Sequence, residues 1–131
     1  MVYRLALHPD AREDLEQLRR VTPTVATKII ALMQEIKGDQ QLLDRLTDDG
    51  FGADRSERFD VSKWAYYFDR GLNLWRLKLW ELERVRLRYR VVYAYEIRSR
   101  TYYVLAIVPR DFNYDPAHPT TQRILDAYHS L

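Results

Sequence analysis

The stretch LWRLKLWELERVRLRYRVVYAYEIRSRTYYVLAIVP (residues 74–109) determines the fold class that the sequence predicts. In residues 74–79, apolar side chains alternate with Arg76 and Lys78, the pattern of a strand with one apolar and one cationic face. Residues 85–93 alternate in the same way, with arginines on the other face. Residues 101–109 are apolar on both faces, as a central strand is. Because the connections are short, we expect these three strands to pair antiparallel.

The residues before and after this stretch are predicted to be mainly helical. Residues 3–7 form a short strand, and apolar side chains at helical spacing predict two helices over 9–21 and 23–38. A last helix covers 120–128, with Thr120 as its N-cap. The predicted fold is α+β: an N-terminal strand and a helical hairpin packed on a mainly antiparallel sheet, a short C-terminal helix, and all helices on one face.

The variable segment, residues 39–73, has a weaker pattern. Three leucines near its start predict a short helical turn, residues 48–54 predict a loop, and residues 61–70 predict a third helix. Five aromatic residues lie in its last part, and Trp64 and Phe68 are expected to be buried against the sheet. A platform on which nucleic-acid bases stack is the alternative for this aromatic cluster.

Length and composition exclude several classes of protein. A chain of 131 residues is the size of one domain, so we predict a single domain over 1–131. Cysteine is absent, which excludes disulfides, thiolate chemistry and cysteine-type metal sites in this chain. The N-terminal sequence has no signal-peptide pattern, and no apolar stretch approaches the length of a membrane span. We expect a cytoplasmic protein without membrane contact.

Positive charge is concentrated in the second half of the chain. Residues 70–110 contain ten basic and three acidic residues, and nine of the ten are arginines. Arginine binds phosphate in a bidentate manner, so the block indicates a polyanionic partner such as nucleic acid. Like charges aligned on one sheet face repel each other, and we expect an anionic ligand to occupy them. A solvated basic face is the alternative.

Several segments, in this order, resemble the RelE/ParE superfamily of toxins from type II toxin–antitoxin modules. They are YRLALHPDAREDLEQL (3–18), the helical hairpin, LWRLKL (74–79), RYRVVYAYE (88–96) and YYVLAIVPR (102–110). The resemblance covers roughly residues 2–38 and 73–115. It implies this fold and, for RelE-like members, cleavage of messenger RNA on the ribosome without metal or cofactor. The segment between the hairpin and LWRLKL is longer than in compact members.

The resemblance also implies roles for individual residues. Arg76 and Lys78 match the family strand that supplies two catalytic cations. Arg90 matches the arginine that holds the phosphate. The basic residue after the last strand falls at Arg110. The tyrosine that stacks on the substrate base has its nearest equivalent at Tyr114.

The chemistry expected of this set is attack of a ribose 2′-OH on the adjacent phosphorus, which needs a base, cations and an acid. Lys78 is the candidate base, Arg76 and Arg90 hold the phosphate, and Arg110 stabilises the leaving group. An arginine is a poor proton donor, so the acid is unassigned; His118 is the histidine nearest in sequence to the site. The candidate substrate-binding residues are Arg84, Arg86, Arg88, Tyr114 and His118.

The expected partners are a cognate acidic antitoxin, messenger RNA and the ribosome. Two other functions remain open from the sequence. A ParE-like toxin that inhibits DNA gyrase would use the same fold without a cationic catalytic site. A non-enzymatic module that binds nucleic acid or a protein partner would use the basic face alone.

Overall fold

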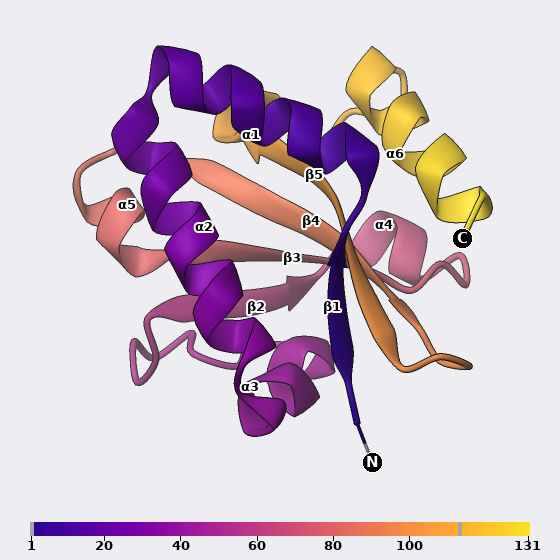
Figure 1. Cartoon of the computed structure of the whole chain (residues 1–131). Coiled ribbons are helices and arrows are strands. Elements are labelled where there is room, and N and C mark those ends of the chain that lie inside the picture. The colour runs from indigo at the N-terminus through magenta and orange to yellow at the C-terminus, as the bar shows by residue number, and fades with distance from the viewer. Residues whose placement is uncertain (1, 113) are drawn as a thin grey trace.

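The computed structural model describes residues 2–112 and 114–131 and has a five-stranded sheet at its centre (Figure 1). The sheet order is β1-β5-β4-β3-β2, so β1 and β2 are its edges. Neighbouring strands from β2 to β5 pair antiparallel, whereas β1 pairs with β5 in parallel. The α+β class and the antiparallel pairing of the three central strands are therefore confirmed. The strands are β1 (Arg4–Leu7), β2 (Phe59–Lys63), β3 (Leu74–Leu79), β4 (Tyr89–Glu96) and β5 (Thr101–Pro109).

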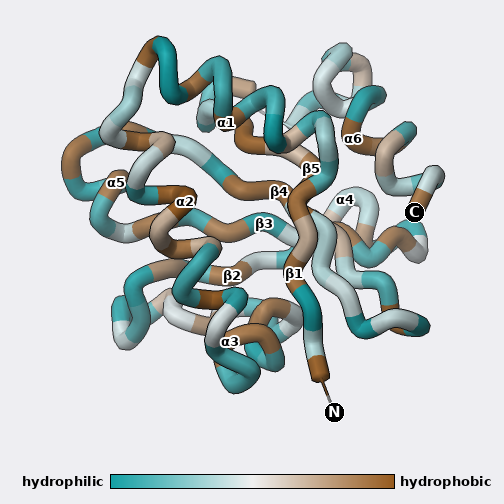
Figure 2. The backbone as a smooth tube through the Cα atoms, viewed as in Figure 1, coloured by the Kyte–Doolittle hydropathy of each residue, from teal (hydrophilic) through white to brown (hydrophobic). Residues whose placement is uncertain are grey.

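The predicted helical hairpin covers one face of this sheet. It consists of α1 (Pro9–Val21) and α2 (Pro23–Lys37). His8 is the N-cap of α1, because its Nδ1 accepts a hydrogen bond from the backbone N–H of Asp10 at 3.1 Å. The apolar stripes of both helices pack against the side chains that β3, β4 and β5 direct to this face. In Figure 2 the hydrophobic segments of the chain are concentrated in the strands at the centre of the molecule.

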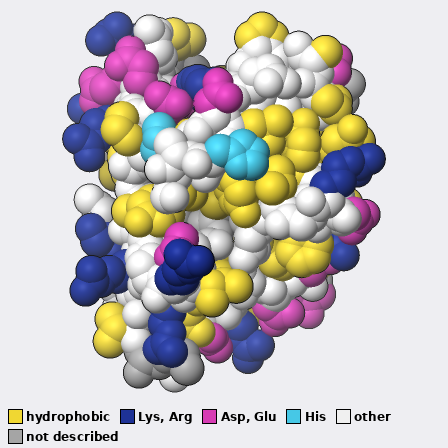
Figure 3. All heavy atoms as spheres, turned by 90° about the vertical axis from the view of Figure 1, so that its right-hand side faces the viewer, with side chains coloured by type: hydrophobic (Ala, Val, Ile, Leu, Met, Phe, Trp, Pro, Cys, Tyr) yellow, Lys and Arg dark blue, Asp and Glu magenta, His cyan; other side chains and the backbone are white. Residues whose placement is uncertain are grey.

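Two further helices, α4 (Ala65–Phe68) and α6 (Pro119–His129), lie on the opposite face, so the prediction of helices on one face is wrong. The reason is that β5 is apolar on both faces and needs cover on both. A second buried cluster there includes Trp64, Leu105 and Ile124. Figure 3 views this end of the molecule and shows a patch of hydrophobic side chains with basic side chains at its margins.

The C-terminal helix differs from its prediction in its cap and is tied to α1. His118, and not Thr120, is the N-cap of α6, because its Nδ1 accepts the backbone N–H of Thr120 at 3.1 Å. From within the helix, Arg123 donates two hydrogen bonds to Asp14 of α1, at 2.9 and 2.7 Å. The same carboxylate accepts the backbone N–H of Ile107 on β5 at 3.0 Å. This contact raises the pKa of Arg123 above its usual value.

The variable segment contributes an edge strand. It begins with the predicted helical turn, α3 (Gln40–Asp44), and the predicted loop follows. The predicted helix over 61–70 is wrong: residues 59–63 form β2, and the helical part is the four residues of α4. The sequence FDVSK alternates apolar and polar residues, and β3 offers an edge with which it can pair. Gly52 sits against this strand at φ +80°, where a Cβ would lie 1.9 Å from the Phe59 carbonyl oxygen.

The stretch of alternating arginines is mostly outside the sheet. Residues 80–84 form the short helix α5 (Trp80–Arg84), a turn follows with Arg86 at φ 62°, and β4 begins only at Tyr89. The prediction of one continuous arginine face from Arg84 to Arg90 is therefore wrong. Leu82, a residue of α5, is buried in the core. Its burial requires the chain to turn at α5 instead of continuing as a strand.

No helix within residues 2–112 and 114–131 is long and apolar enough to span a bilayer.

Candidate active site

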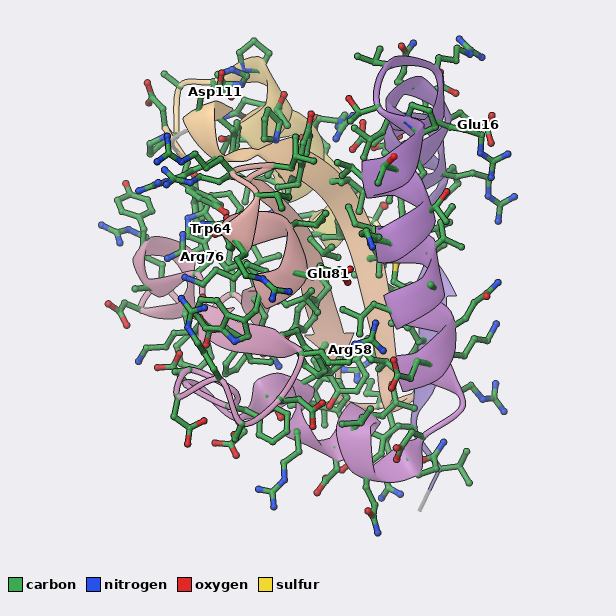
Figure 4. The ribbon with its side chains drawn as sticks, turned by 90° about the vertical axis from the view of Figure 1, so that its left-hand side faces the viewer. Glu16, Arg58, Trp64, Arg76, Glu81 and Asp111 are labelled. Atoms are coloured by element: carbon green, nitrogen blue, oxygen red, sulfur yellow. The ribbon has the colours of Figure 1, made fainter. Side chains whose placement is uncertain are left out.

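A cleft of about 250 Å³, which we call the basic cleft, lies on the sheet face opposite α1 and α2. Figure 4 views the sheet with α2 on one side and Arg76 on the other. All four candidate catalytic residues and Tyr114 line this cleft, although they come from three separate segments of the chain. The full lining is Asp60 and Ser62 of β2, Arg76, Leu77 and Lys78 of β3, Arg90 of β4, and Arg110 and Tyr114 after β5.

The register of the strands explains this convergence. Lys78 is paired with Asp60 and Arg76 with Ser62, so both cations face a polar residue of β2. On the other side of β3, Leu77 pairs with Val91, which makes Lys78 and Arg90 the next residues on their two strands. Adjacent strands lie about 4.8 Å apart, so one row across the sheet carries a carboxylate and two cations within about 10 Å.

Arg90 is largely buried and has an acidic partner. Its guanidinium lies 2.7 Å from Oε1 of Glu83 on α5, and the two side chains are 12% and 14% exposed. It also donates a hydrogen bond to its neighbour's carbonyl, that of Tyr89, at 3.1 Å. The second carboxylate oxygen of Glu83 is buried and has no hydrogen-bond partner among the described residues. Arg90 is therefore held rigidly by a carboxylate that cannot itself reach the cleft.

This ion pair makes a prediction about stability. Arg90→Ala is expected to lower the free energy of unfolding by about 1–3 kcal/mol, because it leaves the carboxylate of Glu83 without its cation in a poorly solvated position. Adding Glu83→Gln should recover most of the loss, because a neutral amide is less costly to bury. Urea denaturation of the wild type, both single variants and the double variant measures the coupling. If the effects of the two single substitutions on the free energy of unfolding simply add in the double variant, the ion pair between Arg90 and Glu83 is contradicted.

Arg76 contacts both ends of the cleft. Its Nε donates a hydrogen bond to Ser62 Oγ at 3.0 Å, and its guanidinium carbon lies 4.5 Å from the centre of the Tyr114 ring. Tyr114 has a left-handed backbone (φ 54°), and its ring meets Trp64 and Phe112 edge-on. One face of the tyrosine ring is therefore occupied by Arg76, in the place where the resemblance expects a substrate base.

The hydroxyl of Tyr114 is buried and makes no hydrogen bond within the described chain. Burial raises the pKa of Tyr114, and the positive charges of Arg76 and Arg90 oppose this shift without cancelling it. The phenol is therefore neutral at physiological pH and is a potential proton donor inside the cleft.

Lys78 is the most loosely held of the three strand cations. Its Nζ lies 3.7 Å from an oxygen of Asp60 and 4.8 Å from the centre of the Trp80 ring. The first distance exceeds that of a direct hydrogen bond. The lysine side chain is 29% exposed, so its ammonium group is free to approach an incoming anion.

The remaining predicted residues lie at the margin of the cleft or outside it. Arg110 is exposed and starts the 3-10 turn after β5, and its N–H donates to the carbonyl oxygen of Arg88 at 2.8 Å. This bond places the exposed turn with Arg86 and Arg88 next to the cleft, while Arg84 is exposed at the end of α5. His118 does not line the cleft: its ring meets Phe112 edge-on, and its Nδ1 caps α6.

The acidic residues of the site were not predicted from the sequence. The predicted helix over 61–70 includes Ser62 and leaves Asp60 just outside, and Glu83 lies between the predicted strands at 74–79 and 85–93. The alternation in FDVSK was the available signal for Asp60. These carboxylates also change one expectation: the repulsion within the cationic face is partly relieved by Asp60 and Glu83, so it does not by itself require an anionic ligand.

Residues 2–112 and 114–131 contain no group of three or more His, Cys, Asp or Glu side chains placed to hold a metal ion. Comparison of the chain with protein-family models, with curated proteins and with solved structures found no match. The functional argument therefore depends on the geometry of the cleft and on the resemblance of the sequence segments.

Proposed function

We propose that this chain is the toxin of a type II toxin–antitoxin module and acts as a RelE-like endoribonuclease on messenger RNA. One observation carries the proposal: Arg76, Lys78, Arg90, Arg110 and Tyr114, which the RelE/ParE resemblance singles out, line one cleft. Their convergence depends on the register of β3 and β4 and on the turn after β5. A basic surface without catalytic function would have no reason to gather this particular set.

The cleft contains groups suited to phosphoryl transfer within RNA. A phosphate bound between Lys78 and Arg90 would be contacted by two cations, and Arg76 would reach it from the same strand as Lys78. Such preorganised donors stabilise the extra negative charge that develops on the phosphoryl oxygens in the transition state. Arg110, at the exposed end, is placed to contact the leaving 5′-oxygen. The products are a 2′,3′-cyclic phosphate and a free 5′-hydroxyl end.

Expression in cells tests this function against the gyrase-inhibition alternative. Induction of the chain should arrest growth and produce new RNA ends that carry a 5′-hydroxyl, while supercoiling by purified gyrase stays unaffected. Comparing free RNA with ribosome-bound messenger RNA in vitro then tests ribosome dependence. Arrest with intact RNA and inhibited gyrase would favour the ParE-like function, and absence of both effects would favour a non-enzymatic binding module.

The toxin proposal also predicts a partner. A neighbouring reading frame should encode an acidic antitoxin with a segment that folds on binding, because the basic block in residues 70–110 offers an acidic segment a surface of opposite charge. Co-expression should give a stable complex, and its affinity should fall with rising salt. If the neighbouring gene products do not bind and induction causes no growth defect, the toxin class is contradicted.

A further inference from the structure

The variable segment brings a carboxylate into the basic cleft that the RelE/ParE resemblance does not include. Asp60 lies on β2, the edge strand that the variable segment adds to the sheet, and its partner in the register is Lys78. Its side chain is 15% exposed, and it is the only acidic residue among those that line the cleft in the described chain. Any polar residue could occupy this position on an edge strand. The residue found here is an acid, and it faces a cationic site.

We propose that Asp60 is the general base of the cleft and removes the proton from the attacking 2′-OH. This inference rests on the proposed endoribonuclease function. A base needs a free lone pair, and a lysine ammonium has none, whereas a carboxylate offers several. Lys78, beside Asp60, then acts as a cation toward the phosphate and not as the base.

The carboxylate of Asp60 is available for this role. Its nearest cation, Lys78 Nζ, is 3.7 Å away, and no hydrogen bond to an Asp60 oxygen occurs among the described residues. Glu83, the other carboxylate near the cleft, is bound to Arg90, and its second oxygen is buried. Asp60 is therefore the acidic group that can meet a bound ribose.

The arrangement across the sheet suits an in-line displacement. Asp60 lies on the edge strand β2, Lys78 and Arg90 lie on the next two strands, and Arg110 and Tyr114 follow β5 at the other end. A phosphate held in the middle has the base on one side and the groups that face the leaving oxygen on the other, as an in-line reaction requires. The 2′-OH proton moves to Asp60 as the 2′-O–P bond forms. The P–O5′ bond breaks with its electron pair on O5′, which takes a proton from solvent.

The pH profile of cleavage separates the two candidate bases, Asp60 and Lys78. Asp60 shares the cleft with Lys78 and Arg76 of β3, Arg90 of β4, and Arg110 and Tyr114 after β5. A carboxylate base stops working when it is protonated, which for carboxyl groups ordinarily happens in the acidic range. A base at Lys78 would place the rising limb several pH units higher, near the titration range of an amine.

The test uses the purified full chain and a short single-stranded RNA under single-turnover conditions. Asp60→Asn should lower the cleavage rate by about 100-fold and remove the acidic limb of the pH profile, with RNA affinity unchanged or stronger. Asp60→Ala should regain part of the activity when formate is added, because a small carboxylate can enter the space. Asp69→Asn is the control, because Asp69 is an exposed carboxylate of the variable segment outside the cleft, and this variant should keep the wild-type rate and pH profile.

Three results would overturn the assignment. An Asp60→Asn enzyme with the wild-type rate and profile would exclude a base at this position. A faster variant would show that the carboxylate only repels the phosphate. A wild-type chain that does not cleave RNA would remove the proposed function and this inference with it, whereas a cleaving wild type with an unaffected Asp60→Asn removes the inference alone. Thermal denaturation of each variant shows whether a lost rate reflects unfolding.

Discussion

Replacing Lys78 or Arg76 with alanine is expected to lower RNA cleavage by about a hundred- to a thousandfold while the protein stays folded. Each side chain is one charge-assisted donor in a partly enclosed site, and loss of such a donor costs about 3–4 kcal/mol of transition-state stabilisation. Both residues are on β3 with their charged ends in the cleft, so their removal leaves the apolar face of the strand intact. Single-turnover cleavage measures the rate, and denaturation measures the fold.

Arg84→Ala and Arg86→Ala are the matched controls for this prediction. Both residues are exposed and lie outside the cleft, so their loss should weaken RNA binding and reduce its salt dependence, with the chemical step unchanged. Wild-type cleavage by Lys78→Ala and Arg76→Ala would contradict the catalytic assignment of these two residues. Arg90→Ala is less informative alone, because the same change also breaks the pair with Glu83.

Trp64→Ala is expected to lower the free energy of unfolding by about 3–5 kcal/mol, the range of a large aromatic truncation in a core. Trp64 is 3% exposed and meets three aromatic rings edge-on, those of Tyr67, Phe112 and Tyr114, at 5.0, 6.4 and 5.1 Å. Because it supports Tyr114, the variant should also weaken any activity of the cleft. The midpoint and slope of chemical denaturation measure the change.

Phe68→Ala is the control for the aromatic cluster. The prediction that both Trp64 and Phe68 are buried is confirmed for Trp64 alone, since Phe68 is 36% exposed. The phenylalanine variant should therefore lose much less stability than the tryptophan variant. An unchanged denaturation midpoint for Trp64→Ala would contradict its place in the core and favour the base-stacking platform.

The sequence predicted those parts of the fold in which one hydrophobic period runs undisturbed. The helical hairpin and β3 are examples, because their apolar residues recur at helical or alternating spacing and the structure buries most of them, with Val21 at the end of α1 as an exposed exception. Residues 84–88 were mispredicted because the alternation of arginines is consistent with a strand, whereas burial of Leu82 determines the backbone. Local pattern and tertiary packing conflict there, and packing determines the structure.

The candidate site was also predicted only in part from the sequence. Arg76 and Lys78 were placed on one face of a strand from their parity, and the structure puts both in the cleft. Asp60 and Glu83 were missed because their positions depend on pairing of an edge strand with β3 and on a turn that a single sequence does not specify. Tertiary structure determines which acidic residue pairs with which basic residue. A count of charges along the sequence does not identify these pairs.

The parallel pairing of β1 with β5 has a consequence for the order in which the protein can fold during synthesis. Leu5 pairs with Tyr102, so the first strand has no partner until nearly a hundred further residues have been translated. The ion pair between Asp14 and Arg123 forms even later. Such non-local contacts slow folding, and a nascent chain completes this sheet only after β5 has left the ribosome. A ribosome that translates this message therefore releases most of the chain before the basic cleft can assemble.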